Sequence, residues 1–272
     1  MAQVSIGITN HYVSTVVELQ SALTEAQNNA MDDVIHIAQG TYTGNFTYVS
    51  NESHNLSILG GYSADFNSVD VNATNTILDG DSADTVITLI ASNTNTDITL
   101  NGLTFTNGNS VDLKGGGLRI ETDGDTSITE SIVSNNAIST AWGSGGGIYI
   151  YGQGDVIIKD SSVMGNVGGP GSGGGGVYIQ GSGETSIIDN IMSNNSVGEA
   201  GGAIGIFSTG NSLIDGNTIT NNSTATGDSS GFGGAGGGVY TSGSGMVTIT
   251  NNIVSDNFSG SGGGGLSLNN KS

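Results

Sequence analysis

Several residue types are scarce in this sequence, and each scarcity excludes a class of protein. Cysteine is absent, so the chain forms neither disulfides nor thiolate metal sites. A single proline without a Gly-X-Y period excludes a collagen-like triple helix. Four basic residues cannot build the Lys/Arg patch that nucleic acids or anionic membranes require, so we expect no nucleic-acid partner. Because no apolar run approaches the ~18 residues that span a bilayer, we expect no membrane insertion by this chain.

Glycine and acidic residues are abundant instead. Glycine accounts for 48 of the 272 residues, whereas a typical protein contains about 7%. The chain has 24 acidic residues and a formal net charge of −20. Apolar residues make up 35% of it, which is too many for a disordered chain. The composition predicts an extended, β-rich protein.

A glycine-rich repeat runs through the second half of the chain. The segment Gly-Gly-[Gly/Ala]-apolar-x-apolar occurs six times, at intervals of 27 to 35 residues. The first apolar residues of these copies are Leu118, Ile148, Val177, Ile204, Val239 and Leu266. An asparagine follows each of the first five copies at a constant distance, at Asn136, Asn166, Asn195, Asn222 and Asn257. The repeat length varies only between this asparagine and the next glycine run, so we expect the loops there.

Two apolar columns keep their distance from these asparagines. Eight residues before them lie Ile128, Ile158, Ile187, Ile214 and Ile249. Three residues before them lie Val133, Val163, Met192, Ile219 and Val254. Such short, β-branched, alternating segments are typical of strands. A repeat made of three short strands buries its apolar face only by coiling, with each strand parallel to its copy about 4.8 Å away.

We therefore predict an all-β fold, a right-handed single-stranded parallel β-helix with 27–35 residues per turn. The isoleucine column should stack in its interior, and the asparagine amides should bond one another at a corner. Residues 34–37, 56–59, 76–78 and 86–90 are expected as strands of earlier turns. We assign residues 34–272 to the β-helix. The sequence stops within a repeat, so we expect a β-helix truncated at its C-terminal end, with end-to-end self-association through this open end.

The N-terminal segment, residues 1–33, carries a helix signal. Thr15-Val16-Val17-Glu18 matches a capping box. The apolar residues Leu19, Ala22, Leu23 and Ala26 then follow helical spacing. A solenoid has to cover its first turn, and we predict that an amphipathic helix reaching about Asn28 does so.

The repeat motifs resemble those of a known group of proteins. Two motifs carry the resemblance: the Gly-Gly-[Ala/Gly]-Ile segments, and a second motif represented by Val133-x-x-Asn136 and Ile219-x-x-Asn222. Both resemble motifs of bacterial polymorphic outer-membrane proteins and related surface β-helix adhesins. Gly60-Gly61-Tyr62-Ser63 looks like the opening of large secreted β-helix repeat proteins. The resemblance covers roughly residues 15–268. It implies a bacterial adhesion module, extracellular or at the cell surface, whose anchor domain lies outside this chain.

One outward-facing column is a candidate ligand-binding surface. It places Arg119, Tyr149, Tyr178 and Tyr240 in one register, with Gly205 on the turn between Tyr178 and Tyr240. Aromatic faces suit sugar rings, but stacked tyrosines also stabilise a sheet by themselves. Two more aromatic residues, Trp142 and Phe232, fall in variable loops, where exposed rings suit a partner.

Two groups of carboxylates are candidate Ca²⁺ ligands. One is the turn sequence with Asp79, Asp81 and Asp84, and the other is the column Glu130, Asp160 and Asp189. Like charges on successive turns repel unless they are screened or bridged by a metal. The alternative is that both groups are hydrated turn residues. No other cofactor is expected.

Three functions remain open at this stage. The favoured one is a non-catalytic extracellular module, a rigid rod that presents loops to a surface glycan or a protein. The second is a polysaccharide lyase or glycoside hydrolase, for which a base beside an acidic array or a pair of carboxylates is needed. Because Arg119 and Lys159 fall on different strands, we assign no catalytic residue. The third is a structural unit that stacks end to end into filaments.

Overall fold

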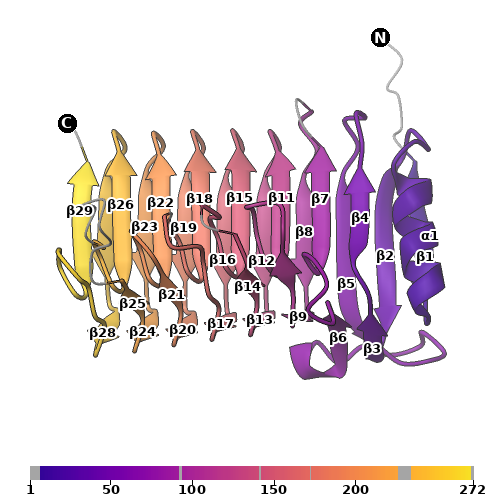
Figure 1. Cartoon of the computed structure of the whole chain (residues 1–272). Coiled ribbons are helices and arrows are strands. Elements are labelled where there is room, and N and C mark those ends of the chain that lie inside the picture. The colour runs from indigo at the N-terminus through magenta and orange to yellow at the C-terminus, as the bar shows by residue number, and fades with distance from the viewer. Residues whose placement is uncertain (1–6, 92–93, 141, 172, 226–233, 271–272) are drawn as a thin grey trace, which may run out of the picture.

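The computed structural model describes residues 7–91, 94–140, 142–171, 173–225 and 234–270. Most of its strands form three long parallel sheets, in which a strand pairs with its counterparts in the preceding and following coils. Figure 1 shows these coils stacked along one axis, from the N-terminal helix to the last strand. The predicted parallel β-helix is confirmed.

We call the three sheets A, B and C. Sheet A contains β1 (Ile8–Val13), β2 (Asp32–Ala38), β5 (Leu56–Tyr62), β8 (Ile98–Asn101), β12 (Thr126–Thr129), β16 (Val156–Lys159), β19 (Thr185–Ile188), β23 (Ser212–Asp215) and β27 (Val247–Thr250). Sheet B contains β3 (Gly40–Thr43), β6 (Thr76–Asp79), β9 (Thr104–Thr106), β13 (Ile132–Ser134), β17 (Ser162–Met164), β20 (Ile191–Ser193), β24 (Thr218–Thr220) and β28 (Ile253–Ser255). Sheet C contains β4 (Phe46–Val49), β7 (Ile87–Ala91), β11 (Leu118–Thr122), β15 (Ile148–Gly152), β18 (Val177–Gly181), β22 (Ile204–Ser208), β26 (Val239–Gly243) and β29 (Leu266–Asn270).

A regular coil runs through sheets C, A and B in that order. Between sheets B and C, short strands also pair, β10 (Asn109–Ser110) with β14 (Ala137–Ile138) and β21 (Ser196–Val197) with β25 (Ser223–Thr224). A 3₁₀ turn, η1 (Ala73–Asn75), precedes β6. The variable loops lie in the same segment between sheets B and C, as the sequence predicted.

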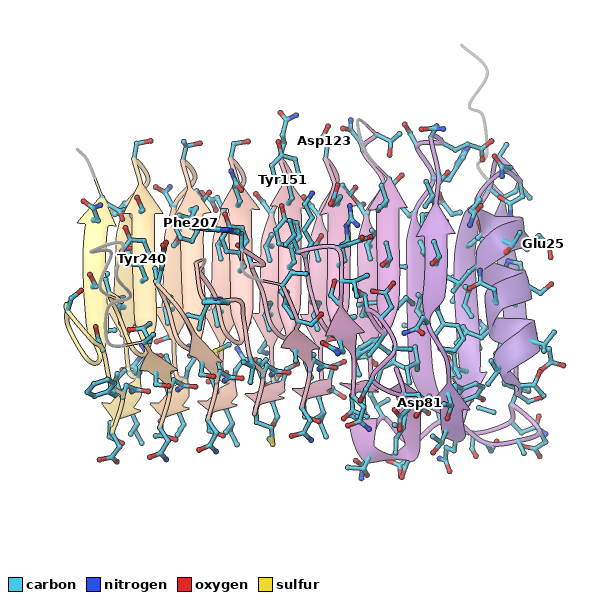
Figure 2. All side chains as sticks on the ribbon, in the orientation of Figure 1. Glu25, Asp81, Asp123, Tyr151, Phe207 and Tyr240 are labelled. Carbon is cyan, nitrogen blue, oxygen red and sulfur yellow. The ribbon has the colours of Figure 1, made fainter. Side chains whose placement is uncertain are left out.

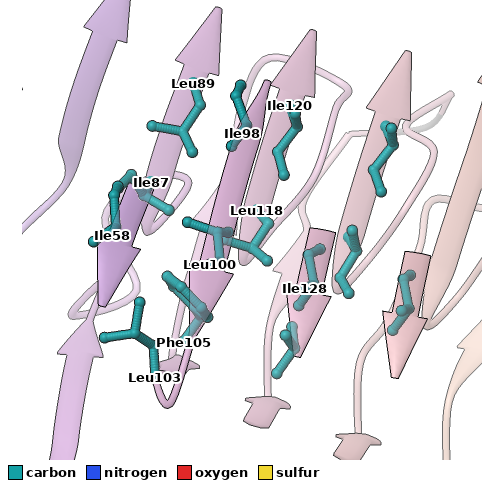
Figure 3. Packing of buried hydrophobic residues seen from close by; sticks show 14 of the residues in the cluster. Ile58, Ile87, Leu89, Ile98, Leu100, Leu103, Phe105, Leu118, Ile120 and Ile128 are labelled. Atoms are coloured by element: carbon teal, nitrogen blue, oxygen red, sulfur yellow. The ribbon is translucent and has the colours of Figure 1, made fainter. Parts of the chain in front are cut away.

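The predicted columns are in register. Ile158 pairs with Ile128 on one side and Ile187 on the other, and the column continues through Ile214 to Ile249. The apolar column of sheet B that includes Val163 and Met192 is also in register from coil to coil. So is the column of sheet C that includes Ile148 and Val177. Figure 3 shows such apolar side chains from neighbouring coils packed against one another in the interior. Ile128, Ile158, Ile187 and Ile214 are fully buried.

The asparagine column forms a hydrogen-bonded ladder. The Asn166 Nδ2 group donates to Oδ1 of Asn195 at 2.9 Å, and Asn195 donates to Asn222 at 3.0 Å. Each amide also donates to a backbone carbonyl, as Asn195 does to Val163 at 2.9 Å. The ladder therefore satisfies the bent backbone at this corner, as predicted.

A second ladder at the corner between sheets A and B was not predicted. Asn190 donates to Asn217 at 3.0 Å, and Asn217 donates to Asn252 at 2.9 Å. Serines take this position in earlier coils, where the Ser131 backbone N–H donates to the Ser161 hydroxyl at 3.1 Å. The change from serine to asparagine obscures the column in the sequence.

A helix covers the N-terminal end of the β-helix. It is α1 (Val16–Ala26), and its buried residues are Leu19, Ala22, Leu23 and Ala26, as the spacing predicted. Thr15 caps it by accepting from the Glu18 backbone N–H at 3.2 Å. The unpredicted strand β1 precedes α1 and pairs in parallel with β2, so strand pairing already begins within the segment 1–33.

Candidate functional site

A row of neighbouring aromatic rings crosses the outer face of sheet C. The Tyr149 and Tyr178 ring centroids lie 5.3 Å apart with planes only 3° from parallel. Phe207 follows at 4.9 Å from Tyr178, and Tyr240 at 5.5 Å from Phe207. We call these four residues the aromatic row. The Lys114 Nζ atom lies 5.2 Å from the Tyr149 centroid and ends the row with a cation–π contact.

Phe207 belongs to this row because of a glycine. Strand register places Gly205, and not Phe207, between Tyr178 and Tyr240. A β-carbon on Gly205 would lie 3.2 Å from the Phe207 ring and 3.0 Å from the Gly174 nitrogen. The Phe207 side chain therefore occupies the place that Gly205 leaves vacant. The sequence signal was an aromatic two residues after Gly205, because such residues share a face of a strand.

A groove of about 490 Å³ opens beside the aromatic row, where the sheet C strands end. Tyr151, Gln180 and Phe207 are register neighbours on β15, β18 and β22 and form its centre. The other residues that line it are Glu121, Thr122, Asp123, Gly152, Gln153, Gly181, Ser182 and Thr209. Figure 2 shows Asp123, Tyr151 and Phe207 along one side of the β-helix, and the coil that carries Gln180 lies between those of Tyr151 and Phe207. Sequence reasoning missed Tyr151, Gln180 and Phe207.

The centre of the groove combines two aromatic rings with an amide. Tyr151 is 49% exposed, Phe207 is half-buried, and the exposed Gln180 lies between them. The Tyr178 hydroxyl donates to Gln180 Oε1 at 3.0 Å and thereby positions the amide. Such a surface can hold the apolar face of a ring while the amide bonds polar substituents.

An ion cluster closes one end of the groove. Both Lys114 Nζ and Arg119 Nε lie 2.9 Å from Oε1 of Glu121, and Arg119 also lies 3.6 Å from Asp112. Burial acts to raise the pKa of Glu121, but the hydrogen bonds and charges of Lys114 and Arg119 together lower it below its ordinary value of 4.5. Glu121 is therefore a carboxylate at neutral pH, held by two cations.

The lowered pKa predicts how the ion cluster responds to acid. A carboxylate with a depressed native pKa stabilises the fold above its unfolded pKa, and this contribution is lost as the pH falls through the native value. Glu121→Gln should therefore be less stable than wild type near neutral pH, and the difference should shrink below about pH 4.5. Urea unfolding at a series of pH values measures this difference. Asp112→Asn is the control and should have little effect on stability, because Asp112 is exposed. A stability difference between wild type and Glu121→Gln that does not change with pH would contradict the prediction.

Two of the predicted ligand-binding residues have packing and pairing roles in the structure. Only 6% of Tyr149 is exposed, so little of its ring can touch a ligand, and burial raises the pKa of its hydroxyl. Arg119 is 18% exposed and is held by Glu121. Tyr178 and Tyr240 lie in the aromatic row and are partly exposed.

Of the two aromatic residues predicted in variable loops, only Trp142 lies within the described residues. Trp142 is 65% exposed, and its ring lies over Gly171 in the loop of the next coil, where a side chain would collide with it. Phe232 lies outside the described residues. Partner binding through these loop aromatics stays a prediction.

Except for Asp79, the last residue of β6, the candidate Ca²⁺ ligands lie outside the strands. Glu130, Asp160 and Asp189 have positive φ values of 49°, 50° and 55°, a conformation that Asp and Asn tolerate better than most residues. Asp79 accepts from the Asn107 amide at 3.1 Å, and Asp84 accepts from the Thr85 backbone N–H at 2.8 Å. Asp81 also has positive φ, and Figure 2 shows it at the edge opposite the groove. Among the described residues, no group of three or more His, Cys, Asp or Glu side chains could hold a metal. Binding of Ca²⁺ stays a prediction.

The coil topology and the buried columns define a solenoid of the parallel β-helix class. A family model described as a right-handed β-helix region matches residues 116–272. This match covers more than half of the chain, which therefore belongs to the right-handed β-helix family. No curated protein and no solved structure matches it. In the part of the chain that the structure describes, α1 is too short to cross a bilayer, and no other helix is long and apolar enough to do so.

Proposed function

We propose that this chain is a non-catalytic module, extracellular or at the bacterial cell surface, that binds a glycan in the groove. The observation that carries the proposal is the pairing of Tyr151 and Phe207 on either side of Gln180. Aromatic faces stack on the apolar faces of sugar rings, and amides bond their hydroxyls. The resemblance of the repeats to surface β-helix adhesins supports the location.

The charges of the groove favour binding over catalysis. A glycoside hydrolase needs one carboxylic acid that remains protonated near neutral pH. Glu121 does not fit this role, because Lys114 and Arg119 hold it ionised. Of the residues that line the groove in the described chain, Asp123 is the only other acid, and none is a lysine, arginine or histidine that could act as the base of a lyase.

Binding and turnover can be measured on the same samples. We expect purified protein to bind soluble polysaccharides in affinity electrophoresis and calorimetry, and to release no reducing ends or unsaturated products, with or without Ca²⁺. Phe207→Ala and Tyr151→Ala should each weaken binding about ten-fold, which corresponds to roughly 1.4 kcal/mol of lost ring contact.

The matched control is Phe258→Ala. Phe258 is an exposed ring that follows β28, at the corner between sheets B and C, away from the groove. Its removal should leave glycan binding unchanged. Product release that Asp123→Asn abolishes would make the chain an enzyme, and equal loss in Phe258→Ala and Phe207→Ala would place the binding site elsewhere.

A further inference from the structure

We infer that the groove selects uncharged glycans and discriminates against polymers that carry carboxylates or sulfates. This inference rests on the proposed glycan binding and specifies its ligand. The two acidic side chains that line the groove in the described chain are Glu121 and Asp123. An anionic sugar would meet both of these acidic side chains, whereas the two cations of the ion cluster, Lys114 and Arg119, are not among the residues that line the groove.

The nearest cations are already paired. Lys114 and Arg119 both bond the same oxygen of Glu121, and the Glu121 side chain is only 13% exposed. Lys114 also lies over the Tyr149 ring. A uronate would have to share either cation with Glu121, which already offsets part of its positive charge.

A row of acidic residues, most of whose carboxylates are held by backbone N–H groups, runs through the turns that precede the sheet A strands. Oδ1 of Asp97 accepts from the backbone N–H of Asp125 at 2.9 Å, Oδ1 of Asp125 from that of Asp155 at 2.8 Å, and Oδ1 of Asp155 from that of Glu184 at 2.8 Å. These residues occupy successive coils, so their carboxylates repeat at about 4.8 Å. We call them the acidic row.

The acidic row follows the groove closely along the chain. Asp125, Asp155 and Glu184 come two residues after Asp123, Gln153 and Ser182, which line the groove. Backbone hydrogen bonds hold the carboxylates of Asp125 and Asp155 in place. The Debye length is about 8 Å at physiological salt, so charges this near the groove are only partly screened. Their potential repels an anionic polymer.

The uncharged groups in the groove suit a neutral sugar. Tyr151 and Phe207 offer apolar faces, and Gln153, Gln180, Ser182 and Thr209 offer amides and hydroxyls. The Tyr178 hydroxyl bonds Oε1 of Gln180, which turns the Nε2 group of this amide to a position where it can donate to a sugar oxygen. Tyr178 thus acts as a positioning residue.

The test uses polymers that differ only in charge. Polygalacturonate and alginate are each presented as the native polyanion and after chemical reduction of their carboxylates to primary alcohols, beside neutral xylan, glucan and galactomannan. We expect the neutral form of a pair to bind at least about ten-fold tighter at about 20 mM salt, with a smaller ratio at about 0.5 M because salt screens the repulsion.

A second variant tests the charge mechanism itself. Glu121→Gln removes the carboxylate that both cations share, so it should shift the ratio of polyanion to neutral affinity about three- to ten-fold towards the polyanion. Tyr178→Phe keeps the stacked ring and should weaken neutral binding without changing this ratio. Tighter binding of the native polyanion than of its reduced form would overturn the inference while leaving glycan binding intact. Failure of every polymer, charged or neutral, would contradict the proposed function instead.

Discussion

Asn195→Ala is expected to destabilise the protein by about 3–5 kcal/mol, because several buried polar groups lose their partners at once. The Asn195 amide donates to Val163 O and Asn222 Oδ1, and its own Oδ1 accepts from the Asn166 backbone N–H at 3.1 Å and from the Asn166 amide at 2.9 Å. All of these groups are buried, so water cannot replace the lost bonds easily. Urea unfolding followed by circular dichroism measures the effect.

Asn211→Ala is the matched control for the ladder. Asn211 makes a similar bond across coils, accepting from the Met246 backbone N–H at 3.0 Å, but at an exposed corner. Water can replace this bond, so the cost should stay near or below about 1 kcal/mol. Similar losses in the two variants would show that the ladder contributes no more than an ordinary surface hydrogen bond.

Ile187→Ala should cost about 2–5 kcal/mol, through lost apolar burial and the cavity left behind. Ile187 is fully buried and pairs with Ile158 on one side and Ile214 on the other. Its neighbours are held by their own strand pairing, so the interior cannot collapse readily around the missing side chain. Denaturant midpoints of the variant and wild type give the difference.

The control is Ile157→Ala on the neighbouring strand β16. Ile157 points outward and is 42% exposed, so the same truncation should cost well under about 1 kcal/mol. An Ile187 effect below about 0.5 kcal/mol would contradict the inward assignment of the isoleucine column.

The coils and their register could be predicted from the sequence because identical residue types return at constant spacing. A strand has a period of two, so an isoleucine that keeps its distance from an asparagine must keep its face of the sheet. This spacing predicts Ile187 in the interior and Asn195 at a corner, where the structure has them. The capping helix followed from the spacing of Leu19 and Leu23 in the same way.

The groove could not be predicted because it depends on contacts between coils that differ from one another. Phe207 joins the aromatic row only because Gly205 on the same strand has no side chain. Arg119 looked available in the sequence, yet the fold pairs it with Glu121 two residues further on. Tyr151 and Gln180 come together through strand register across a gap of 29 residues.

The sequence alone therefore determined the coil, its buried columns and its N-terminal cap, since these depend on periodic burial. Only the tertiary structure decided which outward side chains meet, which cations are already paired and where a groove opens. The physical reason is that burial is a property of each repeat by itself. A binding surface on a solenoid is instead made where successive repeats depart from their common pattern, and its shape depends on how those departures pack.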